Sequence, residues 1–576
     1  MRKQLTLFVL LCFALGLGAQ PVISYWDSAA GIKKSEIHYT EGMQHGLMQL
    51  WYKTGKTAEK GFFKYGYQDS TWFNYYDDGK VKSFRMYKNG QPQGVWKFFY
   101  TNGDTAELDT YSDGKKDGRW QTWNENGSVS SVTPYLKDRK EGQWTYYYPS
   151  GKIQNQGTFM HDKLNGSYKS WYDNGNKHTE GDYNNGRETG SWQIWYSNGN
   201  LKELTVHKDS ASYLMEFNDS TGKKMVTGGN GTVQLFYPDK KLKEEGIYEG
   251  GLREGLSKYY TSSGDEDYEV VYSHGKMNGA YKSWFAADKV KAVGTYKDGE
   301  KDGHWIWYFE NGKKQTVGSM HKNLREGSWT YFIVSGDTEA NGFFKHDEQD
   351  SLWTYYYKGD IKSRQGYYKH NQRNGAWILW YADGSVKEKG NYENDKEEGM
   401  WKSWYDGGQQ QKDEGAYKAG KMAGSWQGWF ENGKMQYQGQ MDSDLKEGHW
   451  TYWYDNGALK SQGNFHKDKR DGHWLTQQPT GIKIEEGDYK NDKPSGKWSY
   501  YYETGVLMQE QTLTDGKPSG KCTSYYPNSK LQSVTNYTLE KDKNGERRGV
   551  PDGEWTFYDK NGNIERTIHY KDGQAQ

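Results

Sequence analysis

The histidines, the cysteine and the acidic clusters are the residues whose types could do chemistry, and none has a catalytic spacing. The fourteen histidines include no H-E-x-x-H pair, and His304, His449 and His473 each follow a glycine at equivalent points of a repeat. Cys522 lies in "GKCTSYY", where most repeats have tryptophan. Zinc hydrolases and cysteine nucleophiles need ligand or base partners at defined spacings. These residues therefore indicate turn and packing roles.

Two acidic segments resemble the start of a calcium loop. They are "DKNG" at Asp542 and "DKNGN" at Asp559, but the remaining ligands of a twelve-residue loop are absent, which favours Asx turns. No G-x-S-x-G, Walker loop or C-x-x-C occurs in the chain. We therefore expect a protein that is not an enzyme and has no cofactor and no metal site.

Aromatic side chains provide the chemistry that remains, namely stacking and apolar contact. They make up 16% of the 576 residues and recur in segments such as "GSWQIWYSNGN" at Gly190. The first residue of each repeated segment, here called the anchor, is glycine except at Ser70 and Ser351. The anchors are residues 46, 70, 94, 118, 142, 166, 190, 231, 255, 279, 303, 327, 351, 375, 399, 424, 448, 472, 496, 520 and 553. Most steps are 24 residues, which identifies a repeat protein.

Positions are counted from the anchor, so position 2 lies two residues after it. Position 2 is tryptophan in 15 of 21 units, position 5 is aromatic in 20, and position 9 is glycine in 17. Asn-Gly or Asp-Gly at positions 8 and 9 is typical of a two-residue type I′ hairpin turn. Such a turn would pair position 2 with 15, position 5 with 12 and position 6 with 11. The pairing also predicts that each Trp lies across the glycine at position 15 of its own hairpin.

The sequence thus predicts an all-β fold, an elongated single-layer antiparallel sheet of about 22 stacked hairpins. One face is apolar and carries positions 2, 6, 11 and 17, and the other is polar with one aromatic per hairpin at position 5. The predicted structural core is Trp72, Trp96, Trp120, Trp144, Trp192, Trp305, Trp329, Trp353, Trp377, Trp401, Trp426, Trp450, Trp474, Trp498 and Trp555. The candidate binding strip is Tyr75, Phe99, Trp123, Tyr147, Trp171, Trp195, Trp284, Trp380, Trp404, Trp429 and Trp453. A row of position-5 rings could equally be a cross-strand ladder that only stiffens the sheet.

Breaks in the repeat suggest a domain order. Residues 1–19, basic and then apolar, predict a signal peptide and an exported protein that is periplasmic, envelope-associated or secreted. We expect a first array with an N-terminal cap at 20–207, a degenerate joint at 208–230 and a second array at 231–537. A loop insertion at 538–552 and a capping repeat at 553–576 complete the chain.

Charge and cysteine content exclude several classes. Lys+Arg and Asp+Glu are 76 each, so nothing indicates a nucleic-acid binder with a basic face. Only Cys522 remains after removal of the leader, which leaves no internal disulfide. No later stretch is long and apolar enough to be a transmembrane segment. The oligomeric state is left open.

The W-x-x-[YW]-[YF]-x-x-G unit followed by G-x-Y-x-x-G resembles the variant MORN repeat of bacterial proteins, some described as YwqK-like antitoxin components. The resemblance implies an array of successive hairpins used for protein or membrane-surface contacts. We therefore expect an exported scaffold whose partner is an unknown protein or an envelope polysaccharide. The alternatives are a carbohydrate or cell-wall binder acting through the aromatic strip, and an envelope-located immunity or antitoxin-like protein.

Overall fold

The computed structural model describes residues 21–27, 29–286, 288–541 and 545–576. These residues form 53 strands and no helix, and neighbouring strands of the sheet pair antiparallel. Some short strands, such as β7, precede a longer strand that pairs with the same partner. The predicted all-β array of antiparallel hairpins is therefore confirmed. The predicted signal peptide lies outside the described residues.

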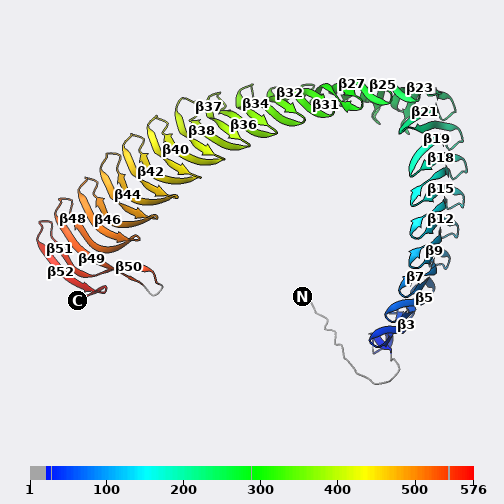
Figure 1. The fold of residues 1–576 in the computed structure, drawn as a ribbon, viewed down its shortest axis with the longest axis horizontal. Coiled ribbons are helices and arrows are strands. Elements are labelled where there is room, and N and C mark those ends of the chain that lie inside the picture. Colours follow the sequence, from blue (N-terminus) through cyan, green and yellow to red (C-terminus); the bar gives the residue numbers. More distant parts are fainter. Residues whose placement is uncertain (1–20, 28, 287, 542–544) are drawn as a thin grey trace. The chain divides into compact units, whose positions relative to one another are not determined.

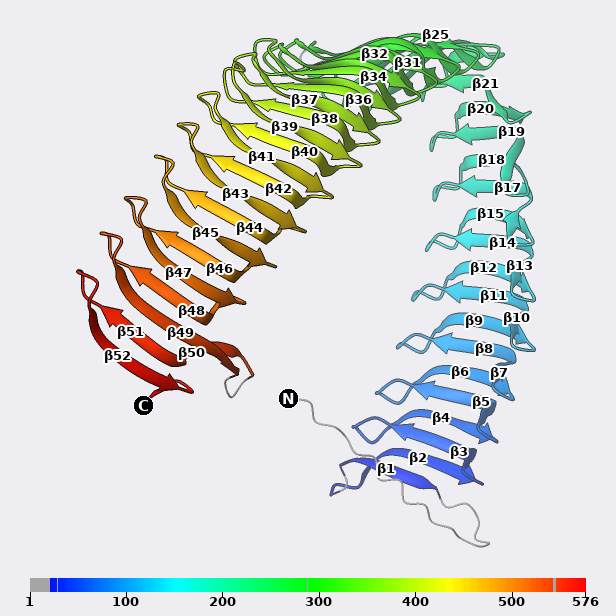
Figure 2. The same ribbon diagram turned by 60° about the vertical axis from the view of Figure 1, so that its left-hand side comes forward.

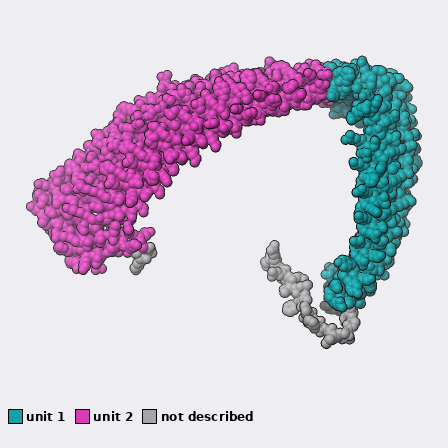
Figure 3. Space-filling model, in the orientation of Figure 1, with its two compact units in different colours: residues 1–264, 271–276 teal, residues 265–270, 277–576 magenta. Residues whose placement is uncertain are grey.

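The chain divides into two compact units (Figure 3), one reaching residue 264 and including 271–276, the other holding 265–270 and 277–576. Within each unit the hairpins are stacked in sequence order (Figures 1 and 2). This division lies beyond the joint expected at 208–230.

The strands of the first unit are β1 (Val22–Asp27), β2 (Ile32–Thr40), β3 (Met43–Trp51), β4 (Thr57–Lys64), β5 (Tyr67–Tyr75), β6 (Val81–Lys88), β7 (Gln91–Pro92), β8 (Gly94–Phe99), β9 (Thr105–Ser112), β10 (Lys115–Lys116), β11 (Gly118–Trp123), β12 (Val129–Leu136), β13 (Arg139–Lys140), β14 (Gly142–Tyr147), β15 (Ile153–Met160), β16 (Lys163–Leu164), β17 (Gly166–Trp171), β18 (Lys177–Asn184), β19 (Arg187–Trp195), β20 (Leu201–Lys208), β21 (Ala211–Asn218), β22 (Lys224–Thr227), β23 (Asn230–Phe236), β24 (Leu242–Glu249) and β25 (Leu252–Tyr260). Residues of β26 (Glu266–Ser273) are divided between the units.

The strands of the second unit are β27 (Lys276–Trp284), β28 (Val290–Lys297), β29 (Glu300–Lys301), β30 (Gly303–Tyr308), β31 (Lys314–His321), β32 (Leu324–Phe332), β33 (Thr338–Lys345), β34 (Glu348–Tyr356), β35 (Lys362–Lys369), β36 (Gln372–Trp380), β37 (Val386–Glu393), β38 (Lys396–Trp404), β39 (Gln411–Lys418), β40 (Lys421–Trp429), β41 (Met435–Asp442), β42 (Leu445–Trp453), β43 (Leu459–His466), β44 (Lys469–Gln477), β45 (Lys483–Lys490), β46 (Lys493–Tyr501), β47 (Leu507–Thr514), β48 (Lys517–Tyr525), β49 (Leu531–Lys541), β50 (Arg547–Pro551), β51 (Gly553–Tyr558), β52 (Ile564–Lys571) and β53 (Gln574–Ala575).

The turn at positions 7–9 has three residues, so the predicted type I′ turn is wrong there. In the hairpin of β36 and β37, the Tyr381 N–H donates to the Ser385 carbonyl at 2.8 Å, and the Gly384 N–H donates to the Tyr381 carbonyl at 3.0 Å. Gly384 has φ +88°, whereas Asp383 is not among the residues with positive φ. This is the three-residue loop in which a glycine follows a tight turn.

A bulge follows from this turn and changes the predicted register. Trp377 pairs with Gly390 as predicted, but Trp380 pairs with Val386 while Leu379 pairs with Glu388. The residue at position 12 therefore has no directly opposite partner, and position 5 pairs with position 11. Aliphatic residues at position 11 consequently share a face with the position-5 aromatics, because directly paired residues lie on one face. The assignment of position 11 to the tryptophan face is thus wrong.

The type I′ turn occurs at the other end of each repeat. Between β37 and β38, Asn394 and Asp395 have φ of 50° and 67° and lie between the paired residues Glu393 and Lys396. Two consecutive positive φ angles define that turn. The same pair of angles recurs, for example, at Asp468 and its neighbour.

The anchor forms a second bulge, and this explains its glycine. Gly366 pairs with Trp377, and Tyr368 pairs with Arg373. The single residue of β35 between these two pairs therefore lies opposite three residues of β36, with Gly375 at their centre. All 21 anchors have positive φ, including Ser70 at 60°. Glycine adopts this conformation without steric cost.

The two interruptions of the repeat are also built from strands. Residues 208–230 contain the short hairpin β21 and β22, which contributes to an apolar cluster of Leu214, Phe217, Val226 and Val233. In the segment 538–552, expected as a loop, the described residues include a hairpin extension in which β49 pairs with β50 from Tyr537–Pro551 to Lys541–Arg547. The insertion thus lengthens a hairpin.

Candidate functional site

The position-2 tryptophans occupy the face that the repeats bury. Twelve of the fifteen are buried, namely Trp72, Trp144, Trp192, Trp305, Trp329, Trp353, Trp377, Trp401, Trp426, Trp450, Trp474 and Trp498. Trp96, Trp120 and Trp555 are half-buried. Aromatic residues at position 17 separate the indoles, as Tyr392 does between Trp377 and Trp401 with edge contacts of 5.8 and 5.0 Å. The result is an aromatic ladder that runs from one hairpin to the next.

Each buried indole covers a glycine of the preceding hairpin, not of its own. A Cβ on Gly366 would lie 2.2 Å from the Trp377 ring, and one on Gly390 would lie 2.1 Å from the Trp401 ring. The Trp377 indole N–H also donates to the Tyr367 carbonyl at 3.1 Å. The prediction that each Trp covers its own hairpin's glycine is therefore wrong, except at Trp144, which lies 3.2 Å from a Cβ on Gly157. The Trp–Gly pair joins neighbouring repeats.

Where position 15 is not glycine, the next tryptophan is displaced. Arg85 and Asp109 stand at this position before Trp96 and Trp120, and both indoles are half-buried. Asp109 is 4% exposed, and its Oδ1 has no hydrogen-bond partner. Burial, followed by the neighbouring Glu107, raises the pKa of Asp109 to about 7. Sequence reasoning missed Asp109, although a carboxylate at a position that is usually glycine is a visible signal of an unusual site.

All eleven residues of the candidate binding strip are half-buried. They lie on the face opposite the indole ladder, where Trp380 pairs with Val386 and Trp195 pairs with Leu201. Eight of the eleven rings thus pair with an apolar side chain, a feature that the predicted register had hidden. The direct partners of Phe99, Trp171 and Trp404 are instead Thr105, Lys177 and Gln411. The strip combines partly accessible aromatic and aliphatic surface.

Charged side chains border this strip and are often paired with one another. Lys362 lies 5.6 Å from the Trp380 ring centre, and Lys389 lies 5.2 Å from that of Trp404. On the same face, Lys402 forms an ion pair with Glu414 at 2.9 Å. The lysine stems therefore cover part of the Trp380 and Trp404 rings while their ammonium groups remain in solvent.

Hydrogen bonds between hairpins make the strip a rigid row. Tyr381 at position 6 donates its hydroxyl to the Trp404 carbonyl at 2.8 Å. Asn432 at position 8 accepts the N–H of Lys434 at 3.0 Å and donates to the carbonyl of Asp455 in the next loop at 2.6 Å. The asparagine of the Asn-Gly dipeptide thus forms one hydrogen bond within its own loop and one to the following loop.

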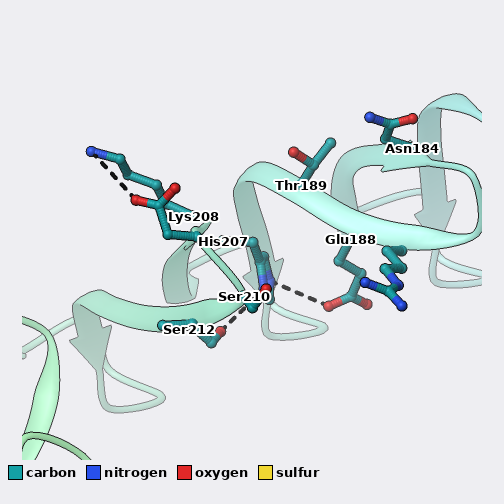
Figure 4. A pocket seen from close by; sticks show the side chains of 10 residues that line it. Asn184, Glu188, Thr189, His207, Lys208, Ser210 and Ser212 are labelled. Atoms are coloured by element: carbon teal, nitrogen blue, oxygen red, sulfur yellow. Dashed lines mark hydrogen bonds and ion pairs between the residues drawn. The ribbon is translucent and has the colours of Figure 1, made fainter.

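A hollow lies at the type I′ turns near β19–β21 (Figure 4). It has a volume of about 690 Å³ and contains a carboxylate–imidazole–hydroxyl chain. His207 Nε2 lies 3.2 Å from Glu188, and its Nδ1 lies 3.2 Å from the Ser212 hydroxyl. This order resembles that of a hydrolase triad with the two ring nitrogens exchanged. However, similar pairs recur near other such turns, including His466 with Glu447 at 2.9 Å, so the contact belongs to the repeat's turn chemistry.

No group of three or more potential metal ligands occurs among the described residues. Beside their anchor glycines, His473 contacts Asp488 at 3.2 Å and His449 contacts Asn464 at 3.3 Å across neighbouring strands. Cys522 is buried as a free thiol at position 2. Asp559 Oδ1 accepts the N–H of Asn561 at 2.9 Å, as in an Asx turn, while Asp542 lies outside the described residues.

In the part of the chain that is described, no helix could span a membrane.

Comparison with known families identifies the repeat. A family model described as MORN repeat variant matches thirteen stretches: 44–65, 92–113, 140–161, 164–185, 188–209, 230–249, 301–322, 373–394, 422–442, 446–467, 494–515, 518–538 and 551–572. Every match begins one or two residues before an anchor glycine, which confirms the predicted repeat type and its frame. No curated protein matches the sequence.

Proposed function

We propose that this array of MORN-type hairpins is an exported, non-enzymatic scaffold that holds a protein or an envelope surface on its aromatic strip. The observation that carries the proposal is the contrast between the two aromatic rows. Trp377 is 3% exposed in the indole ladder, whereas Trp380, three residues later, is half-buried on the opposite face. A continuous row of partly accessible rings is a candidate interaction surface.

Repetition gives such a row its strength. One half-buried ring offers little contact area, but several rings engaged together add affinity where the geometry allows it. The hydrogen bonds between successive hairpins, such as that from Tyr381 to Trp404, hold the rings in a fixed order. A partner therefore binds without first ordering the strip, which lowers the entropic cost of binding.

The test begins with an affinity pull-down from envelope extract, read by mass spectrometry. Replacing Trp380, Trp404, Trp429 and Trp453 together by alanine should weaken binding of the recovered partner far more than any single replacement. The β-sheet circular dichroism should remain. Equal binding by the quadruple variant and the parent would reduce the strip to a structural ladder.

A carbohydrate or cell-wall ligand is the second candidate, because a half-buried ring beside an aliphatic residue, as in Trp380 with Val386, suits the apolar face of a sugar. Retention of the protein on purified peptidoglycan, lost in the same quadruple variant, would favour this candidate. Retention that persists in the variant would argue against it.

A further inference from the structure

In the hairpins between β4 and β9, the sheet face that is mostly polar elsewhere also carries apolar side chains. Along the array, the row formed by positions 3 and 14 is mostly polar, as at Gln427, Gln438, Thr451 and Gln462, which pair in succession. In the early hairpins the corresponding row consists of successive partners across β4, β5, β6, β8 and β9, namely Lys60, Phe73, Phe84, Lys97 and Leu108. Apolar side chains therefore replace amides on the face that is polar elsewhere.

The neighbouring row, formed by positions 1 and 16, is apolar and exposed in the same hairpins. Leu47 and Phe62 pair directly and are 44% and 40% exposed. Met86 and Val95 are 39% and 38% exposed. Together with Phe73 and Phe84, these four residues form what we call the β3–β8 apolar surface.

Aromatic contacts make this surface continuous. The ring centres of Phe73 and Phe84 are 6.3 Å apart, and those of Phe84 and Phe99 are 6.2 Å apart. Phe73 also stacks with Tyr75 at 6.4 Å. The surface therefore merges with the first residues of the candidate binding strip.

Some buried polar groups lie on the other face of the same hairpins. Ser83 and Asp109 are each 4% exposed there. Arg85 stands where most repeats have glycine and forms an ion pair with Glu59 at 3.0 Å. A sheet needs apolar side chains on one face to pack, but here they also face outward, where they contribute little to the packing of this layer.

Positive charge prevails on the β3–β8 apolar surface. Lys60 and Lys97 are the basic members of its described rows, and neither has an ion pair among the described residues. Lys60 lies 5.4 Å from the Phe73 ring centre, and Lys97 lies 5.1 Å from that of Phe99. The one carboxylate in these pairings is Asp69, the half-buried direct partner of Phe62.

We propose that the β3–β8 apolar surface docks a protein segment whose apolar side chains are flanked by carboxylates. The apolar residues supply the buried contact, and Lys60 and Lys97 select the acidic flanks. The inference deepens the proposed scaffold function and rests on it, because it names the partner class for one end of the array.

Two other occupants fit less well. Attraction to an anionic membrane usually needs a cluster of about four to eight basic residues, and this surface has only Lys60 and Lys97. A second copy packed face to face would bring the same unpaired lysines together, and like charges without counter-ions oppose that arrangement.

The experiment uses the full chain and two amphipathic peptides of about 18 residues, roughly five helical turns. One has leucine on one face and glutamate on the other, and its analogue has lysine for glutamate. Fluorescence anisotropy should show binding of the glutamate peptide and little binding of the lysine peptide. Met86→Glu with Val95→Glu should weaken the glutamate peptide's affinity about tenfold or more.

A matched control places the same charges where the array is polar. Gln440 and His449 occupy positions 16 and 1 of successive repeats, as Met86 and Val95 do, and both are exposed. Gln440→Glu with His449→Glu should leave binding unchanged. As a second variant, Lys60→Glu with Lys97→Glu should reverse the preference toward the lysine peptide, a gain that misfolding could not produce.

Several outcomes would overturn the proposal. These are equal binding of both peptides, equal binding by the Met86/Val95 variant and the parent, or capture by phosphatidylserine vesicles that depends on Met86 and Val95. A dimer in light scattering that this variant dissociates would assign the surface to a second copy. The Trp380, Trp404, Trp429 and Trp453 variant should retain peptide binding, so failure of the strip and failure of this surface can be distinguished.

Discussion

The indole of Trp377 lies on Gly366 of the preceding hairpin and donates its N–H to the adjacent Tyr367 carbonyl at 3.1 Å. This relationship explains why tryptophan and glycine recur together. Glycine provides the space, and the bulge at the next anchor, Gly375, accompanies the approach of the two hairpins. Each repeat therefore completes the packing of its neighbour.

Removal of Trp377 should cost much more than removal of Trp380. Trp377→Ala deletes a side chain that is 3% exposed and should lower the free energy of unfolding by about 3–5 kcal/mol. Trp380→Ala deletes a half-buried ring and should cost clearly less. Denaturant melts measure both, with hydrogen exchange to locate the change, because a repeat contacts only its neighbours. Equal losses would contradict the assignment of the two faces.

Gly366→Ala should be destabilising without removing any contact. The new Cβ would lie 2.2 Å from the Trp377 ring, so the indole must move, at a cost of about 1–3 kcal/mol. Gly157→Ala is the control, because its Cβ would lie 3.2 Å from the Trp144 ring and should cost less. Tryptophan fluorescence and urea melts report the displacement and its energy. A smaller effect at Gly366 than at Gly157 would refute this account of the glycine.

The repeat and the pairing of positions 2 and 15 could be read from the sequence because periodic residues mark them. The ring that covers each glycine could not, since Gly390 pairs with Trp377 yet is covered by Trp401. A pattern within one hairpin does not indicate whether a side chain leans toward its own or the next hairpin. Interactions between repeats decide this.

The turn type was mispredicted for a related reason. Asn-Gly favours a type I′ turn in an isolated hairpin. Here Asn432 also binds the carbonyl of Asp455 in the following loop. An asparagine shared between two loops has a role that local turn preference does not include. The face assignment of position 11 then failed, because the three-residue loop adds a bulge at position 12.

The tyrosine at position 6 should contribute through its hydroxyl. Tyr381→Phe removes the donation to the Trp404 carbonyl and should cost about 0.5–1.5 kcal/mol in unfolding free energy. Tyr367→Phe is the control, since Tyr367 is 48% exposed and should be near neutral. Urea denaturation of both variants measures the difference. No difference between the two variants would mean that the position-6 hydroxyl bond to the next hairpin does not stabilise the array.

Asp109 should make the stability of the early hairpins depend on pH. Burial raises its pKa in the fold from the ordinary 3.8 to about 7. The folded state therefore disfavours the carboxylate, and the penalty grows as pH rises from about 4 to about 7 and is complete above that range. The neutral isostere Asp109→Asn removes this penalty. Its melting temperature should match the parent's near pH 4 and exceed it increasingly up to pH 7.

The same residue tests the link between position 15 and the next tryptophan. Asp109→Gly restores the residue found in most repeats and should let the Trp120 indole cover residue 109, as Trp377 covers Gly366. Trp120 should then become less accessible to acrylamide quenching, while Trp96, which follows Arg85, should remain half-exposed as an internal control. Stability should rise and lose the Asp109-dependent change between pH 4 and pH 7. A glycine variant that keeps that pH dependence would assign the titration to Glu107 or another carboxyl group instead.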